Sequence, residues 1–428
     1  MKTFLNWLKA AAEKYNSTSL ILRILIGLVI GVLLALLLPG WTWIGELGNL
    51  FVGALKAIAP VLVFVLVSSA LAQNNGGLDK RFGTVIGLYM LTTFLAAVLA
   101  VIMSFIFPQT IVLADAAASD SVPQGLGEVV HTLLMNVVAN PVEAVASANY
   151  IGILMWAILF GLTMKAVASD SARQFMADVA DAVSMIVRWV INLAPFGIMG
   201  LIFTTVSTSG LSIFTDYGKL LLLLVGTMLI MALVVSPLVI FCCLHVNPYP
   251  LVFRCLKESG IPAFFTRSSA ANIPVNMELC KKMGLDSNFY SVSIPLGSTI
   301  NMDGAAITIT IMTLAAAHTL GIQVSIPAAI ILSVLSALAA CGASGVAGGS
   351  LLLIPMACSL FGIGQDVAMQ VVAVGFIIGV VQDSVETALN SAGDAAFTAT
   401  AEFMHWKREG KPLPAFLTGK RKSAKHRN

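Results

Sequence analysis

The sequence predicts an all-α polytopic membrane protein. Hydrophobic residues make up 58% of the 428 residues and charged residues only 11%, with a mean hydropathy of +0.93. Soluble domains carry roughly 25% charged residues, so a soluble enzyme, a nucleic-acid binder and a disordered chain are excluded. The net charge of +3 indicates no polyanionic partner. We therefore expect membrane lipids, and no nucleic acid, around this chain.

Apolar runs of membrane-spanning length recur through the first 250 residues. A helix needs roughly 20 apolar residues to cross about 30 Å of hydrocarbon. Six runs qualify: Leu20 to Leu38, Leu47 to Ala72, Thr84 to Phe107, Tyr150 to Met164, Ile186 to Val206, and Leu220 to His245. The fourth run follows a shorter helical stretch, Gly127 to Val138, which we expect to end at Asn140 and Pro141.

The basic residues predict which loops face the cytoplasm, because lysine and arginine near span ends resist translocation. They occur around Lys80, Lys165, Arg254 and Lys281 and in the tail from Lys407. The connections 39–48 and 108–127 carry none and contain acidic residues instead. Both termini are therefore predicted to be cytoplasmic, with an even number of crossings. The basic tail sets this topology, or alternatively forms a regulatory or lipid-binding patch.

Acidic residues dominate the second half of the chain. No lysine or arginine occurs between Lys282 and Lys407, yet Asp303, Asp383, Glu386 and Asp394 all lie inside apolar stretches. An ionisable side chain at bilayer depth costs several kcal/mol unless it is paired or faces a polar cavity. The excess of one sign therefore indicates a missing cation.

Residues 327–361 form two arms that are each too short to span. Pro327 to Ala340 is an apolar helix of 14 residues, about 21 Å long, against a core of about 30 Å. A glycine-rich segment, 341–350, and a second short arm, Leu351 to Phe361, follow. Glycine lets the backbone turn and present its polar groups to a ligand, so the pattern indicates a re-entrant hairpin. A flexible turn between two tilted spans is the alternative.

A second tip of this kind lies between Pro250 and Met283, at residues 266–274. Its arms are less apolar than those of the first. Hydropathy alone therefore fits a cytoplasmic loop as well as a hairpin.

Between these two segments, Phe289 to Thr319 is long enough to span but contains Pro295 and the run Asn301-Met302-Asp303-Gly304. Asn301 and Asp303 would lie about 200° apart on a regular helix. We expect the helix to unwind around Gly304, which would free backbone carbonyls. Broken helices at membrane depth supply carbonyl and carboxylate oxygens for Na⁺ or protons. A simple proline or glycine kink is the alternative.

The last span, Asp366 to Phe403, carries a polar stripe. Asp383, Glu386, Thr387, Asn390 and Asp394 fall within about 100° of one another on a helix, so they face one cavity. Polar stripes also join helices to one another, but three carboxylates make that role a poor explanation.

Two hairpins lie around an Asn-Met-Asp-Gly span, and the last span follows with Asp383-x-x-Glu386-Thr387-x-x-Asn390-x-x-Gly393-Asp394. This combination resembles the dicarboxylate/amino acid:cation symporter family. The likeness covers nearly the whole chain and is strongest to the bacterial members that carry serine and threonine with sodium. It implies the glutamate-transporter fold, in which eight transmembrane helices plus two re-entrant helical hairpins form each protomer of a homotrimer. One domain of each protomer moves as an elevator.

The resemblance also implies a division of the chain. Scaffold and trimerisation helices lie in 1–80 and 127–215, transport-domain helices in 81–126 and 216–249, hairpin 1 in 250–283, the broken helix in 284–326, hairpin 2 in 327–361, the substrate-binding last helix in 362–405, and the basic cytoplasmic tail in 406–428.

The resemblance assigns a substrate site to the hairpin tips and the last helix. Asp383 is similar to the residue that holds the substrate ammonium. Asn390 and the tip N–H groups near Ser269 and Val346 resemble the site that binds the α-carboxylate of the substrate. Thr387 occupies a substrate-contacting position. The full expected set is Arg267, Ser268, Ser269, Val346, Asp383, Glu386, Thr387 and Asn390.

Three sodium sites follow from the same resemblance. The first site resembles one formed by Gly297, Asn301, Asn390 and Asp394. The second is formed by Asn301 and Asp303 with Tyr89, Thr92 and Thr93. The third is formed by Thr299 with carbonyls of the second hairpin. Hard oxygen ligands suit Na⁺, and a buried carboxylate gains from an ion beside it.

The sequence departs from the acidic-substrate members at Glu386, where they carry arginine. A glutamate would repel a substrate carboxylate by about 4 kcal/mol at 4 Å and an effective dielectric near 20, so aspartate should be a poor substrate. We expect Glu386 to pair with Arg267 and leave a small cavity for a hydroxyl-bearing side chain. Smaller departures, at Ala270, Ala305 and Ala347, affect side-chain preference or hairpin stiffness.

These patterns predict a sodium-coupled symporter for serine and threonine in the bacterial cytoplasmic membrane, and not an enzyme. The tetrapeptide Gly342-Ala343-Ser344-Gly345 matches that of rhomboid-type proteases, but those need a histidine on a later span. After Ser344 only His405 and His426 remain, at or beyond the end of the last span. Other small neutral amino acids or dicarboxylates are alternative cargoes, and an ion channel is the alternative class.

Overall fold

The computed structural model describes residues 18, 20–73, 80–113, 135, 138–147, 149–211, 213–343 and 348–418. The elements among these residues are all helical. The predicted basic tail beyond Thr418, most of the stretch 127–138, and Val346 and Ala347 lie outside the described residues. Five of the described helices are long and apolar enough to cross a membrane, and six if one bent pair counts as a single span. The chain is therefore a multi-pass membrane protein, as its composition predicts.

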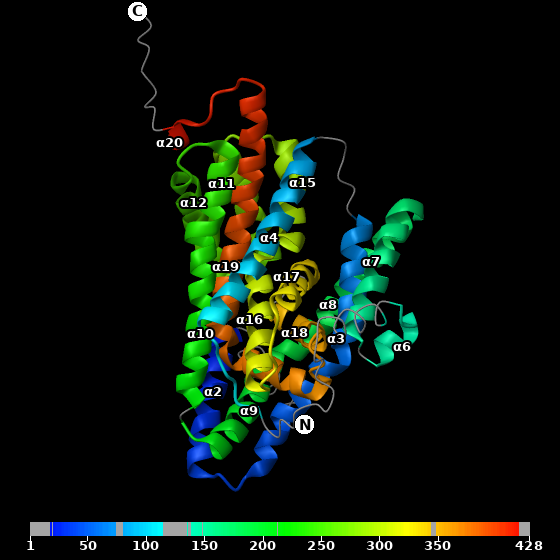
Figure 1. Ribbon diagram of the computed structural model, residues 1–428, viewed down its shortest axis with the longest axis vertical. Helices are drawn as coiled ribbons and strands as arrows, with labels where there is room; N and C mark the ends of the chain where they lie inside the picture. Colours follow the sequence, from blue (N-terminus) through cyan, green and yellow to red (C-terminus); the bar gives the residue numbers. More distant parts are fainter. Residues whose placement is uncertain are drawn as a thin grey trace, which may run out of the picture.

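The first group of helices packs around α3 and α9. It comprises α2 (Leu20–Leu37), α3 (Gly45–Gln73), α7 (Tyr150–Val167), α8 (Asp170–Asn192) and α9 (Ala194–Ser209). Helix α3 contacts α7, α8 and α9, and α2 lies along α9. Helices α2 and α9 lie at the lower end of the molecule in Figure 1, and α7 lies at its right side.

Helices α2 and α9 approach each other closely through Gly27 and Gly31, one turn apart on α2. A Cβ at Gly27 would lie 2.2 Å from the Pro195 carbonyl oxygen, and one at Gly31 would lie 2.6 Å from that of Met199. Small residues at such spacing let helix backbones meet in a membrane, where van der Waals packing replaces the hydrophobic effect. This contact fixes the first helix against the first group.

One sequence prediction in this group needs correction. The predicted span Ile186 to Val206 is two helices, α8 and α9, that bend by 49° at their junction. Pro195 lies in the first turn of α9, where its ring and missing N–H prevent the helix from continuing unbroken. The expected end of the stretch 127–138 at Asn140 stays a prediction, since most of that stretch lies outside the described residues. The Asn140 side chain accepts hydrogen bonds from the N–H groups of Val142 and Glu143 and so caps the following helix, α6 (Pro141–Ala146).

The second group contains the long helices α4 (Lys80–Ile106), α15 (Ser287–Ile300), α16 (Asp303–Thr319) and α19 (Gln365–Arg408). A further helix runs from Ile213 to Leu244 as α10 (Ile213–Ile230), the π-helical turn η2 (Met231–Val235) and α11 (Ser236–Leu244). Helices α4, α10, α11 and α19 follow the long axis (Figure 1) and α19 contacts each of the others. Helix α16 is buried along almost its whole length, so it forms the centre of this group.

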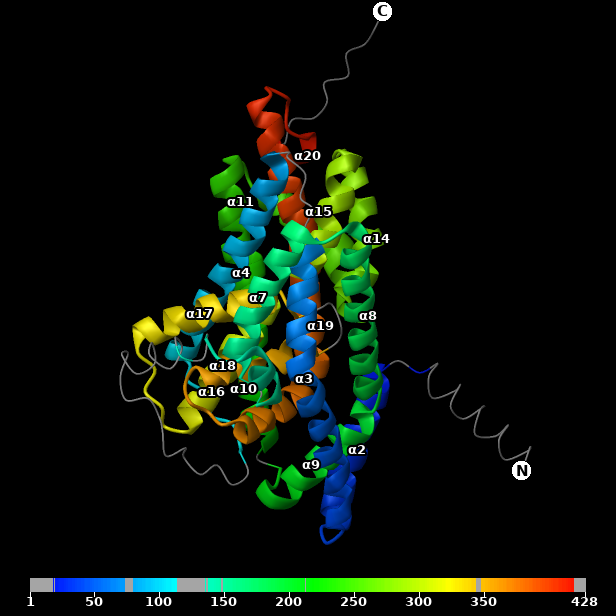
Figure 2. The same cartoon turned by 90° about the vertical axis from the view of Figure 1, so that its right-hand side faces the viewer.

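Two helix–turn–helix segments pack against α19. The first contains α12 (Tyr249–Cys255), the π-helical turn η3 (Leu256–Gly260), α13 (Ile261–Thr266) and α14 (Ser269–Lys282). The second contains α17 (Ile326–Ala340), η4 (Ser350–Leu353) and α18 (Ile354–Ser359). Figure 2 shows α17 lying across the direction of α3 and α4. We call these segments hairpin 1 and hairpin 2.

Glu402, an acidic residue of the last helix, is paired with a basic side chain. Arg81 of α4 forms ion pairs with Glu402 at 2.9 Å and with Asp286 at 3.0 Å, and its guanidinium lies over the Phe289 ring. Trp406 donates its indole N–H to Glu402 at 2.8 Å. This network ties the ends of α4, α15 and α19 together.

Candidate functional site

The central helix of the second group is broken, and the break places the polar residues Asn301 and Asp303 inside this group. Helix α15 ends at Ile300 and α16 begins at Asp303. Between them, Asn301 (φ −92°, ψ 84°) and Met302 (φ −123°, ψ 51°) are not helical. The prediction of a broken helix is therefore confirmed, but the break lies before Gly304 and not around it. Asp303 becomes the first residue of α16, where the helix dipole favours an acid.

Gly304 permits close packing of α16 on the last helix. A Cβ there would lie 2.9 Å from Cα and 3.0 Å from the carbonyl oxygen of Glu386, so no larger residue fits without moving α19. The Gly304 N–H donates to Asn390 Oδ1 at 2.8 Å. The glycine thus serves a helix–helix contact within the first turn of α16.

Gly304→Ala is expected to lower the free energy of unfolding by about 1–3 kcal/mol, because the added methyl meets backbone atoms that cannot rotate away. Thermal unfolding of the detergent-solubilised protein, followed by tryptophan fluorescence, measures the change. Gly87→Ala on α4 is the matched control, since nothing lies within 4 Å of its Cβ position. Equal melting temperatures for the two variants would contradict this account of Gly304.

Asn301 connects the break to α19 and α4. Its side-chain amide donates to Asp394 Oδ1 at 3.0 Å and to the Asn390 carbonyl oxygen at 3.1 Å. The Thr92 hydroxyl donates to Asn301 Oδ1 at 3.5 Å. The structure therefore brings together predicted ligands from three helices.

Asp303 lies at the same level on the other side of the break. The Thr93 hydroxyl donates to Asp303 Oδ1 at 3.1 Å, and it also accepts the Met302 N–H at 3.3 Å. Both threonines and both acids are fully buried. We call this set the oxygen cluster; it consists of Tyr89, Thr92, Thr93, Gly297, Asn301, Asp303, Asn390 and Asp394.

The oxygen cluster leaves two buried carboxylate oxygens without partners. Asp303 Oδ2 and Asp394 Oδ2 make no hydrogen bond in the part of the chain that the structure describes, and no basic side chain there forms an ion pair with either acid. Among these residues, no group of three or more His, Cys, Asp or Glu side chains is placed to hold a metal ion by itself. Carboxylate, amide and hydroxyl oxygens are ligands for hard cations.

Tyr89 and Gly297 lie next to each other and complete the cluster beside Asp394. The Tyr89 hydroxyl lies 2.8 Å from the Thr398 hydroxyl and donates toward the Asp394 carbonyl oxygen at 3.2 Å. A Cβ on Gly297 would lie 2.8 Å from the Tyr89 hydroxyl and 2.9 Å from Asp394 Oδ1, so only glycine leaves this space open. Thr398 is a partner that the sequence analysis missed, although it lies one turn beyond Asp394.

Thr299 is not joined to the cluster. Its hydroxyl donates to the Leu296 carbonyl oxygen of its own helix at 2.7 Å, and its side chain is half-buried. The carbonyls of hairpin 2 expected beside it are not assigned to particular residues, and residues 344–347 of that hairpin lie outside the described residues. Its assignment to a third site stays a prediction.

Asp383 forms the centre of a second group of polar contacts, about three turns from Asp394 along the helix. Arg267 donates its Nε–H to Asp383 Oδ2 at 2.6 Å, and the Gly348 N–H donates to Oδ1 at 3.1 Å. Both charged side chains are buried. The expected pair between Glu386 and Arg267 is therefore wrong, because the guanidinium is held by the carboxylate one turn earlier.

Glu386 instead accepts hydrogen bonds from neutral donors. Its Oε2 receives the hydroxyl of Thr308 at 2.8 Å, the hydroxyl of Ser350 at 2.9 Å and the side-chain amide of Gln382. The sequence analysis missed these three partners. Gln382 was detectable, since it precedes Glu386 by four residues and faces the same side of the helix.

The other predicted substrate residues lie nearby in different roles. Ser268 caps α14 by accepting the Ala271 N–H at 3.2 Å, and Ser269 is the buried first residue of that helix. Thr387 is buried and donates its hydroxyl to the Asp383 carbonyl oxygen at 2.7 Å. Asn390 belongs to the oxygen cluster through its contacts with Asn301 and Gly304.

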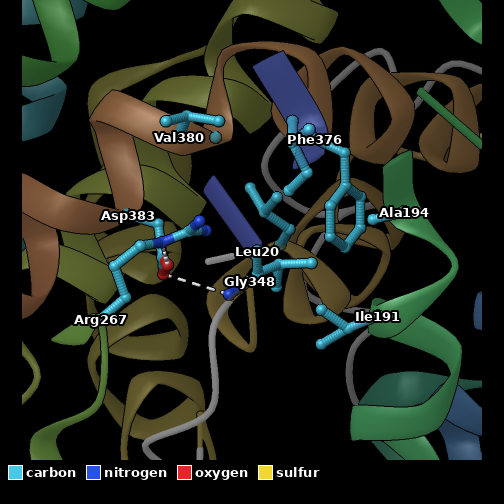
Figure 3. Close-up of a pocket in the computed structure, with 11 residues that line it drawn as sticks. Leu20, Ile191, Ala194, Arg267, Gly348, Phe376, Val380 and Asp383 are labelled. Carbon is cyan, nitrogen blue, oxygen red and sulfur yellow. Dashed lines mark hydrogen bonds and ion pairs between the residues drawn. The ribbon is translucent and has the colours of Figure 1, made fainter. Parts of the chain in front are cut away.

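A pocket lies where the two groups of helices meet. Arg267, Gly348 and Asp383 form one wall, and Leu20, Ile24, Ile191 and Ala194 of the first group form the opposite wall. Figure 3 shows the Arg267 guanidinium and the Asp383 carboxylate side by side at this pocket. The pocket thus brings Asp383 to the boundary between the two groups.

Buried carboxylates, a broken helix and two short hairpins within a multi-pass helical bundle define a membrane transporter. The model of the Sodium:dicarboxylate symporter family matches residues 20–403, and the chain belongs to this family. The resemblance stated from the sequence is thereby confirmed.

Named relatives match nearly the whole chain. "Serine/threonine transporter SstT" of Bifidobacterium adolescentis is 69% identical over 97% of this chain and 97% of its own length. Proteins of the same name from Streptococcus agalactiae and Streptococcus thermophilus are 59% and 57% identical, over 92% and 94% of this chain and 98% and 100% of their own lengths. These relatives are named as transporters and not as enzymes, which excludes the protease interpretation.

Proposed function

We propose that this protein is a sodium-coupled symporter that imports L-serine and L-threonine across the bacterial cytoplasmic membrane. The names of its relatives support the two substrates. Serine and threonine are zwitterions without net charge, so the membrane potential alone does not concentrate them. Each cotransported Na⁺ adds about 2.3 kcal/mol per 100 mV.

The observation that carries sodium coupling is the pair of unpartnered oxygens in the oxygen cluster. Asp303 and Asp394 are fully buried, and each keeps one carboxylate oxygen free of partners among the described residues. A buried uncompensated carboxylate is costly, and a bound cation removes that cost. Asn301 and the hydroxyls of Thr92 and Thr93 supply further oxygens, so we assign Na⁺ to this cluster, with Thr299 beside a third ion.

The substrate site lies on α19 between the hairpin tips. Asp383 holds the substrate ammonium, and Asn390 with the start of α14 at Ser268 and Ser269 receives its carboxylate, because a helix N-terminus favours an anion. Val346 adds a tip N–H group from hairpin 2. Thr387 contacts the substrate, while Glu386 repels a side-chain carboxylate and accepts a hydroxyl.

The two groups of helices correspond to a scaffold and a moving domain. Helices α2, α3, α7, α8 and α9 contact one another more extensively than they contact α4, α10 and α15–α19, which supports this division. We infer eight spans and two re-entrant hairpins per protomer, cytoplasmic termini and a homotrimer in which α19 and both hairpins move as an elevator. Exposed apolar side chains on α2 and α9, such as Leu33 and Phe196, provide surface for lipid or for a second copy.

Uptake of labelled serine into proteoliposomes is expected to be saturable and to fall to background when choline replaces external Na⁺. Unlabelled threonine should compete fully, alanine less well, and aspartate not at all, because Glu386 repels its side chain. Flux that does not saturate would indicate a channel. Sodium-independent serine uptake, or inhibition by aspartate as strong as by threonine, would contradict the proposal.

A further inference from the structure

Asp383 joins the two hairpins. Its Oδ2 accepts the Arg267 Nε–H of hairpin 1, and its Oδ1 accepts the Gly348 N–H of hairpin 2. Each carboxylate oxygen is therefore occupied by a donor from a different hairpin, and Asp383 itself is 3% exposed. Breaking one of these contacts removes the link between hairpins 1 and 2 through this residue.

The same carboxylate is the one assigned to the substrate ammonium under the proposed function. The guanidinium already neutralises Asp383, and an ammonium bound to the same carboxylate would place two cations side by side in a buried site. Like charges at such a distance repel strongly where water is excluded. The contact with Arg267 and a contact with the ammonium are thus alternatives.

The Arg267 contact is built to be exchanged. It consists of a single bond through Nε, whereas arginine and carboxylate pair most stably through two parallel bonds. Its Nη1 is buried without a hydrogen-bond partner among the described residues. The guanidinium also borders the pocket in Figure 3, at the boundary between the two groups of helices.

The backbone at Arg267 indicates that this side chain has a specific role. Arg267 follows the end of α13 with φ 51° and ψ 35°, a left-handed conformation. Helices that end this way usually have glycine at this position, because a side chain there is strained. A long charged side chain in that conformation is explained by its contact with α19.

We propose that Arg267 is a tethered cation that competes with the substrate ammonium for Asp383. This inference rests on the proposed function. When the ammonium leaves, Arg267 neutralises Asp383 and keeps hairpin 1 on α19, so the moving domain can recross the membrane without an uncompensated charge. When the ammonium arrives, it displaces the guanidinium.

Arg267→Gln separates this role from a structural one, because net uptake requires the carrier to return empty and exchange does not. Net uptake into serine-free proteoliposomes is expected to fall by about fivefold or more, while exchange with internal serine stays near wild type. The Kd for serine at saturating Na⁺ should decrease by a similar factor, because the competing cation is gone. Arg267→Met, which keeps the length of the stem, should behave alike if the glutamine variant does not fold.

Arg267→Lys is expected to restore net uptake, since it returns a cation to the site. Arg254→Gln is the control, because Arg254 lies on the same hairpin but pairs with Glu258 at 3.1 Å and lies over the Phe416 ring, and forms no ion pair with Asp383. Equal losses of net uptake and exchange in R267Q, unchanged fluxes, or a weaker serine Kd would each overturn the proposal. If wild-type flux does not depend on Na⁺, the proposed function fails and the competition between Arg267 and the ammonium is still tested by serine binding.

Discussion

Asp394→Asn is expected to abolish sodium-dependent serine uptake. The substitution keeps the shape of the side chain and an oxygen for the Asn301 amide, which now bonds to Asp394 Oδ1 at 3.0 Å. It removes the charge that the unpartnered Oδ2 offers to a cation. One unit of charge at about 4 Å and an effective dielectric near 20 is worth about 4 kcal/mol, or close to a thousandfold in affinity.

Calorimetric titration of Na⁺ into the purified protein measures this effect directly. The wild type should bind Na⁺, and the Asp394→Asn protein should not do so at the same concentrations. Asp366→Asn is the matched control, since Asp366 lies on the same helix but is exposed in its first turn. Sodium binding that survives in the Asp394 variant and is lost in the Asp366 variant would contradict the assignment.

Glu386→Arg should reduce serine uptake to about one tenth or less. Three donors, from Thr308, Ser350 and Gln382, now converge on one carboxylate oxygen. An arginine has no acceptor, so each buried donor would lose its partner at about 1–3 kcal/mol. The new guanidinium would also lie one turn from Asp383 and compete for it.

Glu386→Gln distinguishes the loss of charge from the loss of an acceptor. It keeps one acceptor oxygen and similar volume, so uptake of serine should be intermediate between wild type and the arginine variant. Removing the negative charge should also let aspartate inhibit serine uptake in both variants. Serine kinetics that are unchanged in Glu386→Arg would remove Glu386 from the site.

The fold follows from the sequence wherever composition decides the outcome. Long apolar runs predict α3, α4 and α10–α11, and a short run predicts α17, because length and hydropathy set whether a helix can span. The bend at Pro195 and the cap at Asn140 were not predicted. The apolar run continues through Pro195, so it gives no sign that the helix changes direction there. The apolar run before Asn140 stops at that residue, but this does not show that a new helix begins. Local backbone geometry, and not hydrophobicity, decides both.

The candidate site was predictable in its acids and not in their partners. A buried carboxylate is conspicuous in an apolar stretch, so Asp303, Asp383 and Asp394 stand out. Thr308 and Ser350 are common in membrane helices, and nothing in their spacing relates them to Glu386. The same reason explains the wrong partner for Arg267: charge selects an acid for it, but only the hairpin backbone determines which acid it reaches.

The last helix, α19, is a single element of 44 residues that carries both Asp383 and Asp394. Eleven residues of rise separate these two acids by about 16 Å, a distance that helical hydrogen bonds hold constant. Across that gap the repulsion between a sodium ion and an ammonium is only about 1 kcal/mol at an effective dielectric near 20. Direct attraction or repulsion between the cargoes is therefore too weak to couple them. Asn390 bonds to Asn301 and Gly304 at the oxygen cluster and is also assigned to the substrate carboxylate, so we expect one binding event to alter the other through this residue.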